Sequence, residues 1–249
     1  MYTPTDAEIS RGGWYLPLRD KFAASLLTRC LRDRRVANAT VLDSGCGTGG
    51  ALAELSGPGI LAVGTDTSLT SLLSCRREGR GRFLIQADSQ ALPFRTAAFD
   101  TCLCAEVLEH LDDDAQGLRE LLRVSKGPVV VTVPAHPCLW TDSDDTLGHK
   151  RRYSREDVAH LVDQVQGQIV RIAPFGLLPA LGVIVYKVLT RGAPAAEPRA
   201  PLASRFRMSR WMEGIMAALF RCELALSRAR LLAWGHSWWI EVRGNDRIA

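Results

Sequence analysis

A glycine-rich turn that follows an acidic residue is the part of this sequence best suited to chemistry. Residues 41–50 read VLDSGCGTGG, and Gly45, Gly47 and Gly50 have the spacing G-x-G-x-x-G behind an apolar run. Such a turn leads from a strand into a helix and lets the backbone approach a ligand closely. The spacing alone does not select the ligand, because both dinucleotides and S-adenosylmethionine (SAM) are held on turns of this kind.

Three aspartates near the turn narrow the choice. Asp43 suits a cationic group such as the methionine amino group of SAM and repels a pyrophosphate, because like charges close together are costly. Asp66 ends the next predicted strand, where it can accept hydrogen bonds from the ribose hydroxyls of either ligand. Asp88 ends a third predicted strand and can accept from an adenine amino group, or serve only as a turn residue. Asp43 therefore favours SAM over a dinucleotide.

The elements that position these residues alternate along the first half of the chain. A helix is predicted at 17–37. Strands are predicted at 39–45, 60–66, 82–88, within 97–107 and at 127–134, and further helices at 49–57, 68–77 and 113–124. Strands that alternate with helices at this spacing imply an α/β fold with a parallel sheet covered on both faces.

The second half departs from simple alternation. The prediction is a polar loop at 134–153, a helix at 154–164, a strand at 167–176, an apolar helix at 177–189, a proline-rich linker at 191–204, an amphipathic helix at 207–232 and a strand at 236–244. Ser154 and Asp157 form a capping-box pattern. One stripe of the amphipathic helix carries Trp211, Ile215, Leu219, Cys222 and Leu226.

The overall composition is that of a globular protein with one domain and additions. The chain has 249 residues, 47% hydrophobic and 23% charged, with a net charge of +4. It has no run of basic residues typical of a nucleic-acid arm, so we expect no nucleic-acid partner. Seven cysteines without a C-x-x-C pair, and a polar beginning without an apolar targeting segment, favour a cytoplasmic protein. The uncharged stretch 172–186 is too short to span a bilayer comfortably.

A family resemblance follows from four segments taken together. In their order and spacing, VLDSGCGTGG, GTD, ADSQALPF and FDTCLCAEVLEHLDD resemble the class I SAM-dependent methyltransferases, and within them the branch of ubiquinone- and menaquinone-biosynthesis methyltransferases. The resemblance covers residues 36–133. It implies a Rossmann-like, seven-stranded, mostly parallel sheet with helices on both faces, SAM as the cofactor and S-adenosylhomocysteine (SAH) as the product.

The resemblance also implies site residues. Those at the methionine end of the cofactor are Asp43, Gly45, Cys46 and Gly47; those at the ribose are Asp66 and Thr67; those at the adenine are Asp88 and Ser89; and Ala105 and Glu106 lie beside the methyl donor. The family often has a smaller or apolar residue where Cys46 stands. On this basis we divide the chain into a helical cap (1–37), the SAM-binding core (38–173), a helical insertion (174–233) and the final strand of the core (234–249).

A second segment, VPAHPCLWTDSDDTLGHKRRYS at 133–154, resembles a stretch found in a subset of these enzymes, with Pro137, Leu-Trp at 139–140, Asp144 and GHKRRY at 148–153 as the matching positions. One hypothesis is that it receives an anionic or polar acceptor, since arginine suits carboxylate and phosphate groups. The acceptor-binding candidates are His136, Trp140, Arg151, Arg152 and Tyr153. The alternative is that the arginines and neighbouring aspartates form ion pairs that order a long loop.

Proton transfer and metal binding complete the set of chemical expectations. A base is needed only if the acceptor must lose a proton, and Glu106, His110 and His149 are the catalytic candidates, with His136 also able to serve. His110 could equally be a packing or capping residue. The aspartates at 142–145 do not fit a calcium loop, because Leu147 replaces the turn glycine and Tyr153 the bidentate glutamate, so we expect no metal.

The expected activity is methyl transfer from SAM to a small-molecule acceptor, which could be lipid-like, isoprenoid or phosphate- or carboxylate-bearing. The alternatives are a nicotinamide-dependent oxidoreductase and a non-catalytic SAM-binding partner protein. The insertion at 174–233 could pack as a lid or core, which is our first choice, or dimerise, or make a peripheral membrane contact. The chain is accordingly expected to be a monomer or a homodimer.

Overall fold

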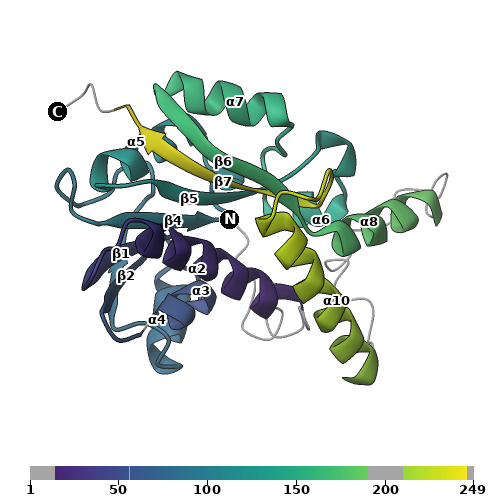
Figure 1. The fold of residues 1–249 in the computed structure, drawn as a ribbon, viewed down its shortest axis with the longest axis horizontal. Helices are drawn as coiled ribbons and strands as arrows, with labels where there is room; N and C mark the ends of the chain where they lie inside the picture. Colours follow the sequence, from purple (N-terminus) through teal and green to yellow (C-terminus); the bar gives the residue numbers. More distant parts are fainter. Residues whose placement is uncertain (1–14, 56, 190–209, 246–249) are drawn as a thin grey trace.

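The computed structural model describes residues 15–55, 57–189 and 210–245 (Figure 1). The predicted linker at 191–204 and the first part of the predicted cap lie outside these residues. Seven strands form one sheet in the order β3-β2-β1-β4-β5-β7-β6. They are β1 (Ala39–Ser44), β2 (Ile60–Asp66), β3 (Phe83–Gln86), β4 (Thr101–Ala105), β5 (Val129–Pro134), β6 (Gly167–Phe175) and β7 (Ser237–Gly244).

The sheet is mostly parallel, as the resemblance implied. Strand β1 pairs in parallel with β2 and β4, whereas β7 runs antiparallel between β5 and β6. Parallel pairing brings the carboxyl ends of β1, β2 and β4 to one edge of the sheet, where ligands bind in open α/β folds. In the register of β1, Asp43 lies opposite Gly64 on one side and Leu103 on the other.

Helices cover both faces, because successive strand residues point to opposite sides. Val41 and Leu103 pack with helices α2 (Tyr15–Asp33) and α10 (Arg210–Arg228), whereas Leu42 and Cys102 pack with α5 (Asp114–Val124) and α7 (Arg155–Gln164). The helices are α2 (Tyr15–Asp33), α3 (Gly50–Leu55), α4 (Leu69–Arg77), η2 (Leu108–His110), α5 (Asp114–Val124), η3 (Pro137–Leu139), α6 (Asp142–Leu147), α7 (Arg155–Gln164), α8 (Leu177–Leu189) and α10 (Arg210–Arg228). No helix among the described residues is long and apolar enough to span a bilayer.

The predicted loop at 134–153 contains ordered structure that the sequence reading missed. The 3-10 turn η3 and helix α6 both lie within it. Helix α6 begins with a reciprocal cap, in which the Asp144 carboxylate accepts from the Thr141 amide at 2.8 Å and Thr141 Oγ1 accepts from the Ser143 amide at 3.3 Å. Gly148 ends the helix in the left-handed region, with φ of 73°.

The insertion consists of α8 and α10, which extend beyond the sheet at one end (Figure 1). The buried side of α10 carries Phe220, Glu223, Leu224 and Ser227. The predicted stripe of α10 does not pack as core, because Trp211 is 68% exposed and Leu219 is 50% exposed. Periodicity identified the stripe, and a neighbouring face of the helix is the one that packs against the domain, through Phe220 and Leu224.

A buried carboxylate joins the two helices of the insertion. Glu223 of α10 accepts hydrogen bonds from the first amides of α8, at 2.5 Å from Gly176, 2.6 Å from Leu177 and 3.2 Å from Leu178. These amides have no partner within their own helix, and the positive end of the helix dipole favours a negative charge beside them. The joint fixes where α8 starts relative to α10.

Replacing Glu223 should loosen this joint selectively. In E223A, three buried amides lose a charged acceptor, so we expect the start of α8 to lose about 2 kcal/mol or more of local stability. Amide hydrogen exchange at residues 176–178 measures the loss directly. Glu156→Ala removes an exposed acid from the first turn of α7 and serves as the control; equal exchange in both variants would contradict the role of Glu223.

Candidate active site

The glycine turn rests on strand β2. The amides of Gly45 and Cys46 donate to the carbonyl of Thr65 at 2.7 and 2.8 Å. Gly45 has a φ of 76°, and a Cβ there would overlap the side chain of Val107, so only glycine fits. The Cys46 side chain is buried in the core beneath the turn. The predicted contact between Cys46 and the cofactor would therefore be made by the backbone of Cys46, and it remains a prediction.

Asp43 is a buried carboxylate without a counter-charge. It is 2% exposed, and its Oδ2 has no hydrogen-bond partner among the described residues. Burial raises the pKa of Asp43 to about 7, with smaller contributions from Asp20 and Asp66. An unpartnered buried carboxylate costs free energy that a cationic ligand would recover, which fits the predicted contact with the amino group of SAM.

Asp66 has a structural task as well as its predicted one. Its Oδ2 accepts from the Gly47 amide at 2.9 Å and its Oδ1 from the Ser68 amide at 2.8 Å. The carboxylate thus ties the glycine turn to the start of α4. Each oxygen keeps a further lone pair, so a ribose contact is compatible with these bonds and remains a prediction.

The predicted adenine and ribose residues beyond Asp66 lie at the same edge. Asp88 is exposed and its Oδ1 accepts from the Gln90 amide at 2.8 Å, as expected of a turn residue. Ser89 is buried, and its hydroxyl lies 2.8 Å from that of Ser44 at the end of β1. Thr67 is exposed. Their contacts with a cofactor remain predictions.

Glu106 follows β4 in a strained conformation. Its φ is 56°, in the left-handed region that non-glycine residues rarely adopt, and its amide donates to Thr132 at 2.9 Å. The Oε1 atom is buried without a hydrogen-bond partner among the described residues. Backbone strain of this kind costs about 1–3 kcal/mol and concentrates at functional sites. Ala105 is thus the last residue of β4, next to β1, and Glu106 follows it; their position beside the methyl donor stays a prediction.

Helix α2 contributes residues that the sequence reading did not single out. A Cβ on Gly50 would overlap the carboxylate of Asp20, so this acid lies against the end of the glycine turn. Arg19 forms an ion pair with Asp20 at 3.0 Å. Burial, followed by the nearby charge of Glu106, raises the pKa of Tyr15, which places that phenol in the same region. Only a long-range contact brings α2 here, and nothing in its own sequence indicated it.

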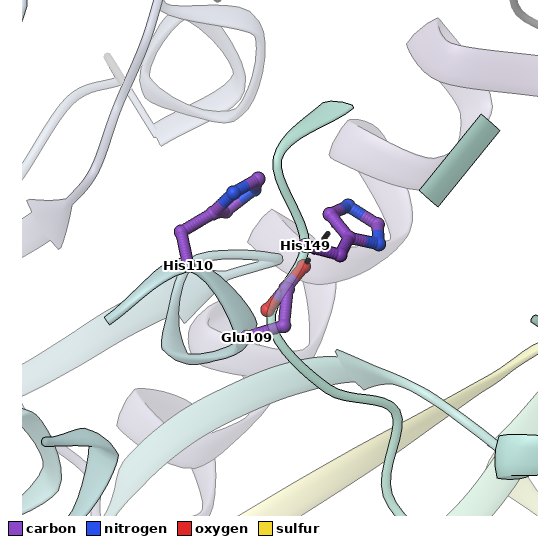
Figure 2. A group of neighbouring side chains, drawn as sticks. All are labelled: Glu109, His110 and His149. Carbon is purple, nitrogen blue, oxygen red and sulfur yellow. Dashed lines mark ion pairs between the residues drawn. The ribbon is translucent and has the colours of Figure 1, made fainter. Parts of the chain in front are cut away.

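Two candidate bases, His110 and His149, converge on a third group, Glu109 (Figure 2). Glu109 is fully buried, and neither of its carboxylate oxygens has a hydrogen-bond partner among the described residues. His149 Nε2 lies 4.0 Å from Glu109 Oε1, and the two imidazole rings are 4.8 Å apart, edge to face. Burial, with a further contribution from Glu106, raises the pKa of Glu109 well above its usual value.

The hydrogen bonds of the two rings fix which nitrogen faces Glu109. His149 Nδ1 lies 2.9 Å from Asp144 Oδ1, and His110 Nδ1 lies 3.3 Å from the Gly148 carbonyl. Both partners can only accept, so each Nδ1 donates and each neutral ring presents a lone pair on Nε2. Burial lowers the pKa of His110 to about 4, so that ring is neutral at pH 7.

The same three residues are the group that could hold a metal ion. Their ligand atoms lie within 4.8 Å of one another. Zinc ligands sit about 2.0–2.2 Å from the ion, so small side-chain rotations would bring two imidazoles and a carboxylate into range. Our prediction of no metal considered only the aspartates at 142–145, which form helix α6. Glu109 and His110 are neighbours in the sequence, but His149 is about 40 residues further on, and only the fold brings it to them.

The arginines of GHKRRY are engaged within the protein. Arg152 is 7% exposed, and its Nε donates to Asp144 Oδ1 at 2.8 Å while Nη1 donates to the Ala135 carbonyl at 3.1 Å. Its Nη2 lies 3.3 Å from His236 Nε2. Every nitrogen of this guanidinium therefore has a partner, which is the arrangement expected of a loop-ordering ion pair.

Arg151 and Tyr153 share a second acid. Arg151 pairs with Asp114 at 3.0 Å, and the Tyr153 hydroxyl donates to the same carboxylate at 2.8 Å. Tyr153 is 2% exposed. We therefore revise the acceptor-binding expectation for Arg151, Arg152 and Tyr153: their polar atoms order the segment and attach it to α5 and α6.

His136 and Trp140 remain acceptor-binding candidates. His136 has a φ of 57°, stacks on Trp234 at 4.9 Å, and has a buried Nε2 without a hydrogen-bond partner among the described residues. Burial lowers its pKa, followed by the charge of Arg152. Trp140 is half-buried, and its indole Nε1 donates to Asp145 at 3.1 Å.

The fold and this edge of the sheet together define a class of protein. The seven-stranded sheet with one antiparallel strand, the glycine turn after β1 and the acid in front of that turn agree with what the resemblance to class I methyltransferases implied. Comparisons with known proteins agree with that class.

Residues 42–130 match the methyltransferase domain family. Malonyl-[acyl-carrier protein] O-methyltransferase of Pseudescherichia vulneris is 30% identical over 154 residues, 59% of this chain and 61% of the relative. Demethylmenaquinone methyltransferase of Corynebacterium kroppenstedtii is 42% identical over 86 residues, 34% of this chain and 37% of the relative. The chain thus spans less than two thirds of the length of either relative.

The structure of magnesium protoporphyrin IX methyltransferase from Synechocystis, with bound SAH, has the same fold. It superposes with a TM-score of 0.51 at 17% identity, covering 61% of this chain and 74% of that one. Residues 42–130 thus match a methyltransferase domain and the fold agrees with it, in line with the resemblance to the class I SAM-dependent methyltransferases, whose cofactor is SAM.

SAM binding should depend on pH through Asp43. The free carboxyl has a pKa of about 7, and a cationic ligand favours its ionised form, so affinity should fall up to tenfold for each pH unit below 7 and level off above it. In D43N the slope should vanish and affinity at pH 7.5 should fall by about tenfold or more. Isothermal titration calorimetry measures both. Asp163→Asn on the exposed face of α7 is the control; a D43N protein with the wild-type pH slope would refute the assignment.

Glu109 should make the protein less stable as the pH rises. Its pKa is raised in the folded state, so the folded protein holds an extra proton above pH 4.5 and the free energy of unfolding falls as pH rises through that window. E109Q removes this dependence. We expect its Tm at pH 7.5 to exceed that of the wild type by about 3 °C or more, with the difference shrinking towards pH 4.5.

Scanning calorimetry with and without a chelator separates this result from metal binding. If Glu109 carried a metal ion in the purified protein, E109Q would melt below the wild type, and the chelator would lower the wild-type Tm. Either result would contradict the prediction of a protonated, metal-free carboxyl.

Proposed function

We propose that the chain transfers the methyl group of SAM to a small-molecule acceptor at the carboxyl edge of β1, β4 and β5. The observation that carries this proposal is the buried carboxylate of Asp43 without a counter-charge, directly before the glycine turn. The sulfonium of SAM is already activated, so the protein has mainly to align the two reactants and exclude water.

We assign the cofactor contacts as the resemblance implied them. Asp43 would hold the methionine amino group, Asp66 and Thr67 the ribose, and Asp88 and Ser89 the adenine. The glycine turn, with Gly45 and Gly47, would let the backbone approach the methionine end. The support from the structure is that all of these residues lie where β1, β2 and β3 end.

His149 is our choice for a general base when the acceptor must lose a proton. Its Nδ1 is held by Asp144, so its Nε2 lone pair is fixed in direction. Asp144 is in turn bonded to Arg152 and to the Thr141 amide, and these partners lower its pKa against the opposing effect of burial, so it remains ionised. An ionised acid behind the ring stabilises the imidazolium that forms when Nε2 takes a proton. Glu106 and His110 would border the same space.

The acceptor is most consistent with an apolar or weakly polar molecule. The donors of Arg151 and Arg152 are already used, which argues against a phosphate-bearing acceptor held by them. His136 and Trp140 offer ring faces on the same side of the sheet. The two relatives are named for different acceptors, malonyl-[acyl-carrier protein] and demethylmenaquinone, so their names support methyl transfer without selecting one. The buried carboxylate of Asp43 would repel a pyrophosphate, which argues against the nicotinamide alternative.

A turnover assay with methyl-labelled SAM tests the proposal. The acceptor panel should contain phenols and quinols, carboxylic acids and their thioesters, and isoprenoid alcohols, with mass spectrometry of each product. With an acceptor that loses a proton, H149A should reduce kcat by about 10²–10⁴-fold while the Kd for SAM stays unchanged. His160→Ala, on the exposed face of α7, is the matched histidine control. If the protein bound SAM but transferred no label to any acceptor of the panel, the result would favour the non-catalytic SAM-binding alternative.

A further inference from the structure

The exposed apolar surface of this protein is concentrated on the insertion. Seventeen large hydrophobic side chains among the described residues are exposed, and ten of them lie on α8 and α10. The two helices contribute only 13 and 19 residues. Single exposed apolar residues are ordinary on protein surfaces, but a concentration on two neighbouring elements marks an interaction site.

These side chains form continuous stripes. On α8, Leu181, Ile184, Val185 and Val188 have the spacing of one helix face, and they are between 38% and 64% exposed. On α10 the predicted stripe has the same three- and four-residue spacing. The opposite sides of the two helices are the ones that pack, through Ala180 and Val183 on α8 and through residues such as Phe220 on α10.

The two stripes are held in a fixed arrangement. Glu223 joins α10 to the start of α8, as described above. Further along α8, Lys187 Nζ donates to the carbonyls of Cys138 at 2.7 Å and Trp140 at 3.1 Å. The apolar surface of α8 is therefore anchored next to Trp140, one of the remaining acceptor-binding candidates.

Basic residues outnumber acidic residues on these two helices, although the sequence of α10 also contains Glu213. The exposed charged side chains described on the two helices are Lys187, Arg221 and Arg228, whereas the described acid, Glu223, is buried. The sequence between the helices carries four more arginines, at 191, 199, 205 and 207, against one glutamate at 197. Two copies of such a surface would repel each other, whereas an anionic surface would attract it.

We propose that α8 and α10 dock the protein onto the surface of an anionic lipid bilayer, with their apolar stripes in the boundary between headgroups and acyl chains. Interfacial helices bind in this way through apolar area together with attraction of basic residues to anionic lipid. The proposal is independent of the methyl-transfer assignment. It also places the membrane next to the residues that border the acceptor side of the sheet.

Co-sedimentation of the full chain with vesicles tests the proposal. We expect binding to vesicles that contain phosphatidylglycerol, weaker binding to pure phosphatidylcholine, and loss of most binding at about 0.5 M salt, where the screening length falls to a few ångströms. L219E and V188E, at exposed positions on the two helices, should each weaken binding by tenfold or more. R221E should weaken it by about fivefold or more, on anionic vesicles only.

The matched control is Leu73→Glu, since Leu73 is an exposed leucine on α4 with 57% exposure. Every variant should bind SAM like the wild type, because no substituted residue touches the glycine turn. Unchanged SAM binding would show that the core is folded. The absence of sedimentation with anionic vesicles at low salt would overturn the proposal, as would an equal loss in L73E. A dimer in sedimentation velocity that L219E converts to a monomer, without vesicle binding, would identify a second copy as the partner instead.

Discussion

One constraint underlies this structure: within the described part of the chain, buried carboxyl oxygens without hydrogen-bond partners lie at the carboxyl edge of the sheet. Parallel pairing of β1 with β2 and β4 brings Asp43 and Glu106 to one edge, and η2 adds Glu109. Each has at least one buried carboxylate oxygen without a hydrogen-bond partner among the described residues. Burying such groups opposes folding. A chain that places them together at a ligand-binding edge is organised around a molecule that supplies positive charge or takes up protons.

Asp144 shows how the fold treats an acid whose task is structural. It accepts from His149, from Arg152 and from the Thr141 amide, and these partners lower its pKa although burial opposes them. His149 thus stands between two carboxylates of opposite character. Asp144 is ionised and fully bonded, whereas Glu109 is buried and has a raised pKa. This asymmetry gives the imidazole a fixed direction, with its Nδ1 donor towards Asp144 and its Nε2 towards Glu109.

Local patterns in the sequence predicted a large part of the fold. The glycine turn, the apolar helix at 177–189 and the Ser154–Asp157 cap are all found in the structure, since each depends on residues close in sequence. The sequence from Thr141 to Asp144 has the same capping-box pattern, but the prediction for this segment was a loop. Other features depend on contacts between distant segments: Asp20 against Gly50, Glu109 against His149, and the ion pairs of Arg151 and Arg152. No periodicity identifies such partners, which explains why arginines expected to face an acceptor are bonded within the protein.

The insertion also shows that local sequence patterns do not predict which face of a helix is buried. Helical periodicity shows that α10 has an apolar stripe, but burial depends on what the rest of the chain places against it, and the domain packs against a neighbouring face through Phe220 and Ser227. The exposed stripe is costly in water, so its retention on a rigidly joined pair of helices calls for a partner. Because Lys187 of α8 donates to the carbonyl of Trp140, a partner that covers that surface would lie next to one of the acceptor-binding candidates. An apolar acceptor delivered from a bilayer would reach this side without crossing water, which links the two otherwise separate features of the molecule.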